Sequence, residues 1–171
     1  MTILISYDGS TNADAAIATA AALLGPKEAS AVVLAVWEPL LVQALRAERF
    51  GSMFLAVPSD VVGEDKQTAE AARHLAEHGA RLAGEAGFDA RALWIADRRN
   101  IANAIIENAD ELDVDLIVMG ARGLAGISAY IGSVSNHVLQ HAHRPVLIVP
   151  AGSRPGSEAA ASEATPAPAD G

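Results

Sequence analysis

Glycine and serine residues gather in one segment that directly follows the most apolar strand-like run of the chain, DLIVM. The segment, GARGLAGISAYIGSVSNH, spans residues 120–137. Gly120 and Gly123 have no Cβ atom, so a ligand can approach their backbone closely and positive φ angles cost little. Gly132 and Ser133 open a helical pattern, whose free amides and dipole favour an anion such as a phosphate. In chemical terms, these residue types can form a nucleotide cradle.

The same residues also fit an ordinary turn followed by a capped helix, because glycine and serine are common between a strand and a helix. Other nucleotide signatures are missing from the chain. It contains no G-x-x-x-x-G-K-[ST] motif, no G-x-G-x-x-G motif and no S-G-G-x-D-S motif after the first strand-like run. The local pattern alone leaves both interpretations open.

Length and composition predict a single α/β domain. The chain has 171 residues, of which 51% are hydrophobic and only 4% aromatic, so Ala, Val, Leu and Ile supply most of the apolar surface. This composition is typical of alanine-rich helices packed on aliphatic strands. The chain has no cysteine, which excludes disulfides, thiolate catalysis and cysteine-ligated zinc.

The charge balance argues against polyanionic partners. The net charge is −9, which repels nucleic acid and anionic membranes at long range. The apolar run over residues 15–25 is too short to span a bilayer, and it follows an acidic turn where a signal peptide would have a basic start. We therefore expect a cytoplasmic protein with no nucleic-acid partner and no membrane partner.

Strand-like and helix-like segments alternate along the chain. Strands are expected at 2–7, 31–37, 89–96, 115–119 and 145–149, and helices at 12–25, 59–87, 100–112 and 133–141. Ser59 or Asp60 is the expected cap of the second helix, and Asn100 that of the third. Strict alternation with doubly buried strands predicts an α/β fold with an open five-stranded parallel sheet and helices on both faces.

Two segments stand apart from this alternation. Residues 39–58 form a long excursion with a helical stretch of their own, either a flap packed on its own domain or a lid or subunit contact. Residues 151–171 contain no aliphatic side chain larger than alanine. They cannot bury enough surface to offset the entropy of ordering, so we expect a domain over residues 1–150 and a disordered tail.

In an open parallel sheet, ligands bind beyond the carboxyl ends of the strands, where the strand order reverses. Two loops at those ends look specialised. One is Asp8-Gly9-Ser10 after the first strand, and the other begins at Gly120 after the fourth. We expect the binding site to lie between them.

Three stretches resemble the universal stress protein family: ILISYDGS at the start, DLIVMGARG before the loop and GSVSNHVLQHAHRPVLIVP at the end. The resemblance covers about residues 1–150. It implies a flavodoxin-like, Rossmann-like domain with strand order 3-2-1-4-5 and a homodimer formed through the strand at 145–149. The family has members that bind ATP and members that do not.

The ATP-binding branch carries the pattern G-x2-G-x9-G-[ST]. The resemblance places Asp8 near adenine or ribose, the Val36 backbone against adenine, and the phosphates around the start of the last helix, with Arg122 adding a positive charge. ATP with Mg²⁺ is the implied cofactor. The implied nucleotide-binding residues are Asp8, Gly9, Ser10, Val36, Met119, Gly120, Arg122, Gly123, Gly132, Ser133, Val134 and Ser135.

The chain departs from this pattern at one point. Residues 124–131 supply eight positions between Gly123 and Gly132, where the pattern has nine. In a helical segment, the loss of one residue shifts the following backbone by about 1.5 Å and rotates it by roughly 100°. The departure favours the alternative, a universal stress protein that binds no nucleotide and acts only through protein–protein interaction.

Histidines form two groups, His74 with His78, and His137 with His141 and His143. Four-residue spacing on a helix can hold zinc, but the chain has neither an H-E-x-x-H motif nor a cysteine. We interpret all five as surface or dimer-contact residues and expect no metal site.

The loops of the expected site show no recognisable nucleophile–base pair. We therefore expect no catalytic residues and no enzyme, with at most slow ATP hydrolysis. The resemblance implies a homodimeric stress-response module whose ATP occupancy alters its contacts with an unidentified regulatory protein partner.

Overall fold

A computed structural model of the chain describes residues 1–25, 29–40, 42–43, 61–97, 100–121, 131–150 and 152–153. Most of the 39–58 excursion lies outside these residues, as does the 151–171 tail apart from residues 152–153. Ser59 and Asp60, the expected caps of the second helix, also lie outside them.

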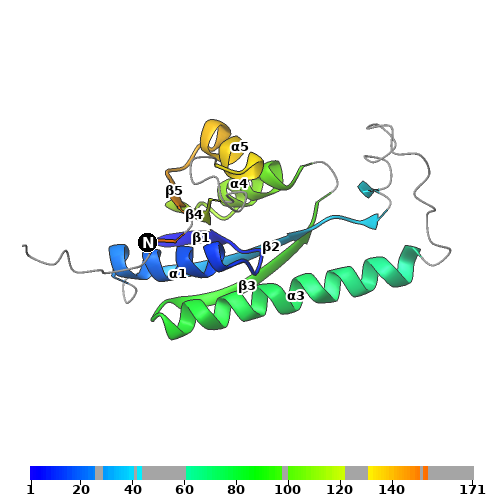
Figure 1. The fold of residues 1–171 in the computed structure, drawn as a ribbon, viewed down its shortest axis with the longest axis horizontal. Coiled ribbons are helices and arrows are strands. Elements are labelled where there is room, and N and C mark those ends of the chain that lie inside the picture. The colour runs from blue at the N-terminus through cyan, green and yellow to red at the C-terminus, as the bar shows by residue number, and fades with distance from the viewer. Residues whose placement is uncertain are drawn as a thin grey trace, which may run out of the picture.

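The core of the molecule is one parallel sheet of five strands in the order β3-β2-β1-β4-β5 (Figure 1). This confirms the predicted fold class and strand order. The strands are β1 (Thr2–Ser6), β2 (Ser30–Trp37), β3 (Asp89–Ala96), β4 (Leu116–Gly120) and β5 (Val146–Val149).

The order of the sheet reverses between β1 and β4. From β1 the chain builds outward to β2 and β3, then crosses back to add β4 and β5 on the other side of β1. At the end of β1, Ser6 lies opposite Leu34 on one side and Met119 on the other. The carboxyl end of β1 is therefore the point at which this fold type places its ligands.

Helices cover both faces of the sheet, as predicted. The helix α1 (Thr11–Leu24) and the long helix α3 (Val61–Glu85) pack on one face, whereas α4 (Ile101–Glu111) and α5 (Ser133–His141) pack on the other. Because side chains alternate along a strand, Ile3 and Ile5 enter the first core and Leu4 the second, all of them fully buried.

Side chains at the helix termini explain where the helices begin and end. The Asn100 side chain accepts a hydrogen bond from the Ala102 amide at 2.9 Å, which confirms the predicted cap of α4. Gly25 ends α1 with a φ of 67°, a backbone conformation that glycine adopts at little cost. Within the described residues, no helix is long and apolar enough to cross a membrane.

Candidate ligand-binding cleft

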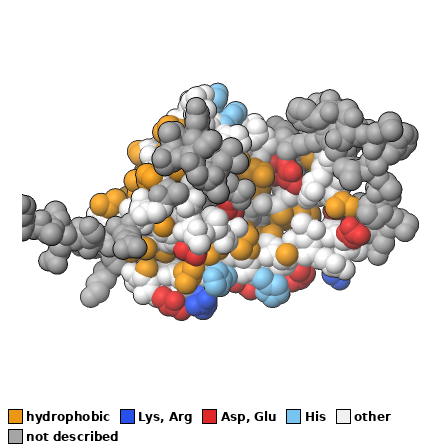
Figure 2. Space-filling model, in the orientation of Figure 1, with side chains coloured by type: hydrophobic (Ala, Val, Ile, Leu, Met, Phe, Trp, Pro, Cys, Tyr) orange, Lys and Arg blue, Asp and Glu red, His pale blue; other side chains and the backbone are white. Residues whose placement is uncertain are grey.

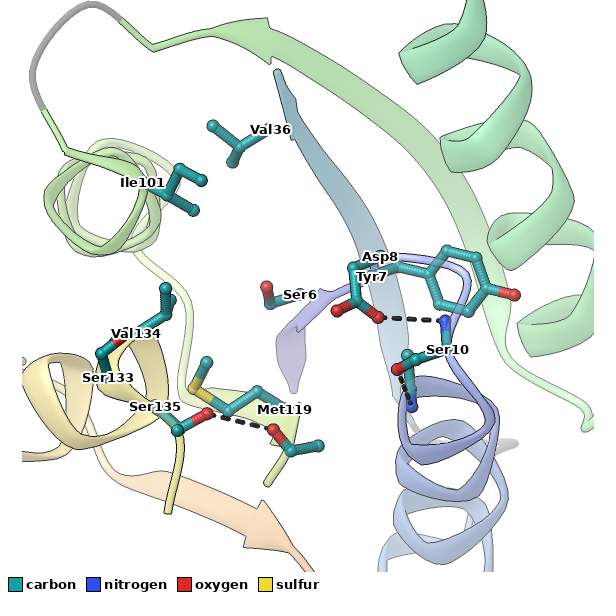
Figure 3. A pocket seen from close by; sticks show the side chains of 13 residues that line it. Ser6, Tyr7, Asp8, Ser10, Val36, Ile101, Met119, Ser133, Val134 and Ser135 are labelled. Carbon is teal, nitrogen blue, oxygen red and sulfur yellow. Dashed lines mark hydrogen bonds between the residues drawn. The ribbon is translucent and has the colours of Figure 1, made fainter. Parts of the chain in front are cut away.

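A cleft of about 200 Å³ opens at the carboxyl ends of the central strands, where the strand order reverses (Figure 3). Residues from separate parts of the sequence meet there. Nine of the residues predicted from the sequence line it, namely Asp8, Ser10, Val36, Met119, Gly120, Gly132, Ser133, Val134 and Ser135. Arg122 and Gly123 lie outside the described residues.

The loop after β1 is held by its own short side chains. The Asp8 carboxylate accepts a hydrogen bond from the Ser10 amide at 3.0 Å, and the Ser10 hydroxyl accepts one from the Ala13 amide at 3.2 Å (Figure 3). Ser10 thereby caps α1. Both bonds fix the loop backbone and keep Asp8 in the lining of the cleft.

Gly9 is not among the residues that line the cleft. Its φ is 74°, and a Cβ atom at this position would come within 2.8 Å of the Leu75 side chain on α3. The positive φ of the turn is what requires glycine here, because the Leu75 methyl group is the end of a flexible side chain that can move.

The first turn of α5 forms the opposite wall of the cleft. Gly132 is the N-cap and accepts the first helical hydrogen bond from the Asn136 amide at 2.8 Å. The amides of Ser133, Val134 and Ser135 precede that bond, so they lack partners within the helix. No side chain caps this helix, and its first turn contains no acidic residue. This end of the cleft therefore suits an anion.

Gly120 lies close to the backbone of α1. A Cβ atom at this position would lie 2.8 Å from the backbone carbon and oxygen of Asn12 on α1. The Asn12 side chain also donates a hydrogen bond to the Ala121 carbonyl at 2.8 Å. The space left by the missing Cβ is thus filled by α1, which gives a packing reason for glycine at this position, while Gly120 also lines the cleft.

Ile101 closes the apolar end of the cleft, facing Val36 (Figure 3). It is the first residue of α4, directly after the Asn100 cap. Ile101 precedes Ile105 at helical spacing, a pattern typical of a core-facing position, and Ile101 does pack against the second core. The sequence pattern gives no sign that it also lines the cleft. Ser6, Tyr7 and Ala13 also line the cleft and were not predicted.

Tyr7 directs its side chain away from the cleft and toward α3 (Figure 3). Its hydroxyl donates a hydrogen bond to the Asp14 carboxylate at 2.7 Å. Its ring packs closely against Gly79 of α3, where an added Cβ atom would lie 2.8 Å from the ring. Burial, followed by the contact with Asp14, raises the pKa of Tyr7 well above its ordinary value. The phenol therefore stays protonated and acts as a structural donor.

The histidines lie apart from the cleft lining. His74 and His78 are exposed on α3, whose outer surface carries alternating charges along the lower edge of Figure 2. On α5, the rings of His137 and His141 stack with centroids 4.2 Å apart, and His137 contacts the Asn103 side chain at 2.9 Å. Within the described ranges, no group of three histidine or acidic side chains is placed to hold a metal ion.

Fold and cleft together define an open, doubly wound α/β domain with a cleft at the reversal of its strand order. The family model of the universal stress protein family matches residues 1–150, and the chain belongs to this family. A Thermus aquaticus protein named "Universal stress protein in QAH/OAS sulfhydrylase 3'region" is 33% identical over 149 residues, which cover 86% of this chain and 97% of the relative.

Solved structures of universal stress proteins share the fold. The UspA protein of Lactobacillus plantarum superposes with a TM-score of 0.63 at 19% identity, covering 87% of this chain and 97% of that one. A universal stress protein from Archaeoglobus fulgidus, solved in complex with dAMP, gives 0.55 at 20% identity over 87% and 97%. An Arabidopsis thaliana family member with AMP bound gives 0.59 at 17% identity over 87% and 90%.

Proposed function

We propose that the chain binds an adenine nucleotide, ATP with Mg²⁺, in the cleft between the β1 and β4 loops. One observation carries the proposal: Asp8, Val36 and the amide-bearing start of α5 converge on a single cleft at the reversal of the strand order. Each of these groups matches a different part of a nucleotide. The relatives solved with dAMP and with AMP support the same class of ligand.

In the proposed arrangement, the base lies between Val36 and Ile101, and the Asp8 carboxylate accepts hydrogen bonds from the ribose hydroxyls. The phosphates lie over the free amides of the first turn of α5. The family pattern also assigns Arg122 and Gly123, which lie outside the described residues, to phosphate binding. The helix end supplies positive potential locally, so the overall charge of −9 does not prevent anion binding.

A magnesium ion would offset the negative charge of the phosphates in the proposed site. Among the described lining residues none is lysine or arginine, and Asp8 is the one carboxylate. A triphosphate held mainly by amides retains most of its negative charge. A magnesium ion on the phosphate oxygens, which keeps most of its own water ligands, reduces that charge without any dedicated protein ligands.

We further propose that the protein is a cytoplasmic homodimer that pairs through β5 and acts as a regulatory binding module rather than as an enzyme. β5 lies at an edge of the sheet, with Val146, Leu147 and Ile148 only partly buried. Leu139 of α5, a few residues before β5 in the sequence, has a side chain that is 48% exposed. An apolar edge strand of this kind is a template for pairing with a second copy. Nucleotide occupancy would then alter contacts with a regulatory partner.

The shortened spacing over residues 124–131 favours a second candidate function, a universal stress protein that works without a nucleotide. The two candidates differ in one measurable property. Nucleotide extracted from the purified protein and identified by chromatography, followed by calorimetric titration with ATP and Mg²⁺, separates them. We expect saturable binding. Absence of bound nucleotide together with no heat at millimolar ATP would leave only the second candidate.

A further inference from the structure

Five of the residues that line the cleft carry a hydroxyl, although Tyr7 turns its own away toward Asp14: Ser6, Tyr7, Ser10, Ser133 and Ser135. Three of them are already engaged. Tyr7 donates to Asp14, Ser10 accepts from the Ala13 amide, and Ser135 donates to the Gly120 carbonyl. In the part of the chain that the structure describes, the hydroxyls of Ser6 and Ser133 make no hydrogen bond.

Ser133 starts α5 and belongs to the phosphate end of the proposed site, whereas Ser6 lies at the cleft floor, away from that helix (Figure 3). Ser6 is the last residue of β1, paired with Leu34 and Met119 on its two sides, so its backbone is fixed. Its chain neighbours Ile5 and Tyr7 enter the core on the opposite face. Alternation therefore directs Ser6 into the cleft.

The Ser6 hydroxyl is available to a ligand. The residue is partly buried at the end of the central strand, and it lines the cleft with no hydrogen bond between its hydroxyl and any described residue. The Ser6 oxygen is not among the fully buried polar atoms that lack a partner, so water can hydrate it when the cleft is empty. A ligand atom that accepts a hydrogen bond from Ser6 replaces that water, so the hydroxyl is suited to ligand recognition.

We infer that the Ser6 hydroxyl donates a hydrogen bond to the purine ring nitrogen N3, the base acceptor nearest the sugar. This inference rests on the proposed nucleotide site. Figure 3 shows Ser6 between the apolar end at Val36 and Ile101 and the loop that carries Asp8. In the proposed arrangement the base lies at Val36 and Ile101 and the ribose lies near Asp8, so the Ser6 hydroxyl faces the junction of base and sugar. Ser6 is then a specificity-determining residue, which selects bases with an acceptor beside the sugar.

Calorimetric titration of three proteins with three ligands tests this inference. The proteins are the wild type, Ser6→Ala and the control Ser30→Ala; the ligands are ATP, 3-deaza-ATP, which lacks N3, and 2′-deoxy-ATP, each with Mg²⁺. Ser30 is a strand serine at the other end of the sheet, where its hydroxyl lies 3.2 Å from that of Thr2. The control therefore removes a strand hydroxyl without touching the cleft.

Ser6→Ala should weaken ATP binding by about fivefold, within the range typical of one hydrogen bond. Its affinity for 3-deaza-ATP should equal that of the wild type, and Ser30→Ala should match the wild type with every ligand. The melting temperature of Ser6→Ala should not fall, because no hydrogen bond between described residues is removed.

Equal ATP affinity of Ser6→Ala and the wild type would overturn the inference and leave the proposed function standing. A loss that persists with 3-deaza-ATP, or that disappears only with 2′-deoxy-ATP, would overturn the assignment to N3. Failure of the wild type to bind any of the three nucleotides would refute the proposed function, and the role of Ser6 with it.

Discussion

The Ser135 hydroxyl donates a hydrogen bond to the backbone carbonyl of Gly120 at 3.1 Å, which ties the first turn of α5 to the end of β4 (Figure 3). Ser135 is 3% exposed. The two residues stand at opposite ends of the glycine-rich segment, and both line the same cleft. The eight-residue spacing between Gly123 and Gly132 therefore does not separate the start of α5 from β4.

Replacing Ser135 with alanine should loosen this connection. We expect the free energy of unfolding to fall by about 1 kcal/mol, the usual net worth of one hydrogen bond, and ATP affinity to fall several-fold because the amides of α5 are held less firmly. Urea unfolding and calorimetry measure the two effects. Ser133→Ala is the control for stability, since its hydroxyl does not cap the helix; a Ser135→Ala protein as stable as the wild type would contradict the role of this bond.

The backbone around Gly120 should not tolerate a side chain. Gly120→Ala places a Cβ 2.8 Å from backbone atoms of Asn12, which cannot move without shifting α1. We expect a loss of about 1–3 kcal/mol in the free energy of unfolding. Gly84→Ala on α3 is the matched control because its Cβ would meet nothing within 4 Å, and it should stabilise the protein by about 0.5–1 kcal/mol. Equal unfolding midpoints for the two variants would contradict the close packing of α1.

Much of the fold follows from local patterns in the sequence. The apolar runs, the Asn100 cap and the strict alternation of strand-like and helix-like segments correctly predict the five strands, the start of α4 and the covering of both faces. These features depend on residues close together in the chain, where hydrogen bonding and side-chain alternation act directly.

What the sequence does not reveal depends on contacts between distant segments. Gly120 lines the cleft, but a Cβ atom there is excluded by Asn12, which lies far from it in the sequence. Ser6 and Ile101 were missed because an apolar periodicity does not show where a core ends and a cleft begins. Only the packing of α4 against the sheet decides that Ile101 faces Val36.

Substitution of Gly123 by valine tests the proposed phosphate-binding part of the cleft. Gly123→Val should abolish ATP binding while the protein keeps its fold, because the branched side chain would occupy the proposed phosphate space. Calorimetry measures binding, and circular dichroism measures the fold. Gly84→Val on α3 is the control for the introduction of valine at an unobstructed glycine. Normal ATP affinity of Gly123→Val would show that the proposed site is misplaced.

Alkaline pH should destabilise the protein through Tyr7. Burial and the hydrogen bond to Asp14 raise the pKa of Tyr7 in the folded state above its ordinary value of 10.0. The native state therefore holds this proton more tightly than the unfolded chain does. The resulting stabilisation is complete below pH 10 and is lost as the pH rises from there toward the folded-state pKa.

The variant Tyr7→Phe removes this titration together with the hydrogen bond. We expect it to be less stable than the wild type by about 1–2 kcal/mol at pH 7. Its free energy of unfolding should then fall less steeply above pH 10 than that of the wild type. Urea unfolding at several pH values between 7 and 11 gives both curves. Parallel curves over that range would contradict a raised pKa for Tyr7.

The free edge of β5 gives a test of the dimer that leaves the sheet intact. The carbonyls of Pro145 and Val149 accept hydrogen bonds from β4, at 2.9 Å from the Ile117 amide and 2.8 Å from the Ala121 amide. Because hydrogen-bonding groups alternate along a parallel strand, the amide of Val146 faces the open edge. Val146→Pro removes that amide without breaking the ladder to β4, and proline is tolerated at such edge positions.

Val146→Ala is the matched control, since it also loses the valine side chain but retains the amide. In sedimentation velocity at micromolar concentration, we expect the wild type and Val146→Ala to sediment as dimers and Val146→Pro as a monomer with an unchanged circular dichroism spectrum. A monomeric wild type would refute the proposed dimer. A dimeric Val146→Pro would show that the copies do not pair through the backbone edge of β5, because that pairing requires the amide that proline lacks.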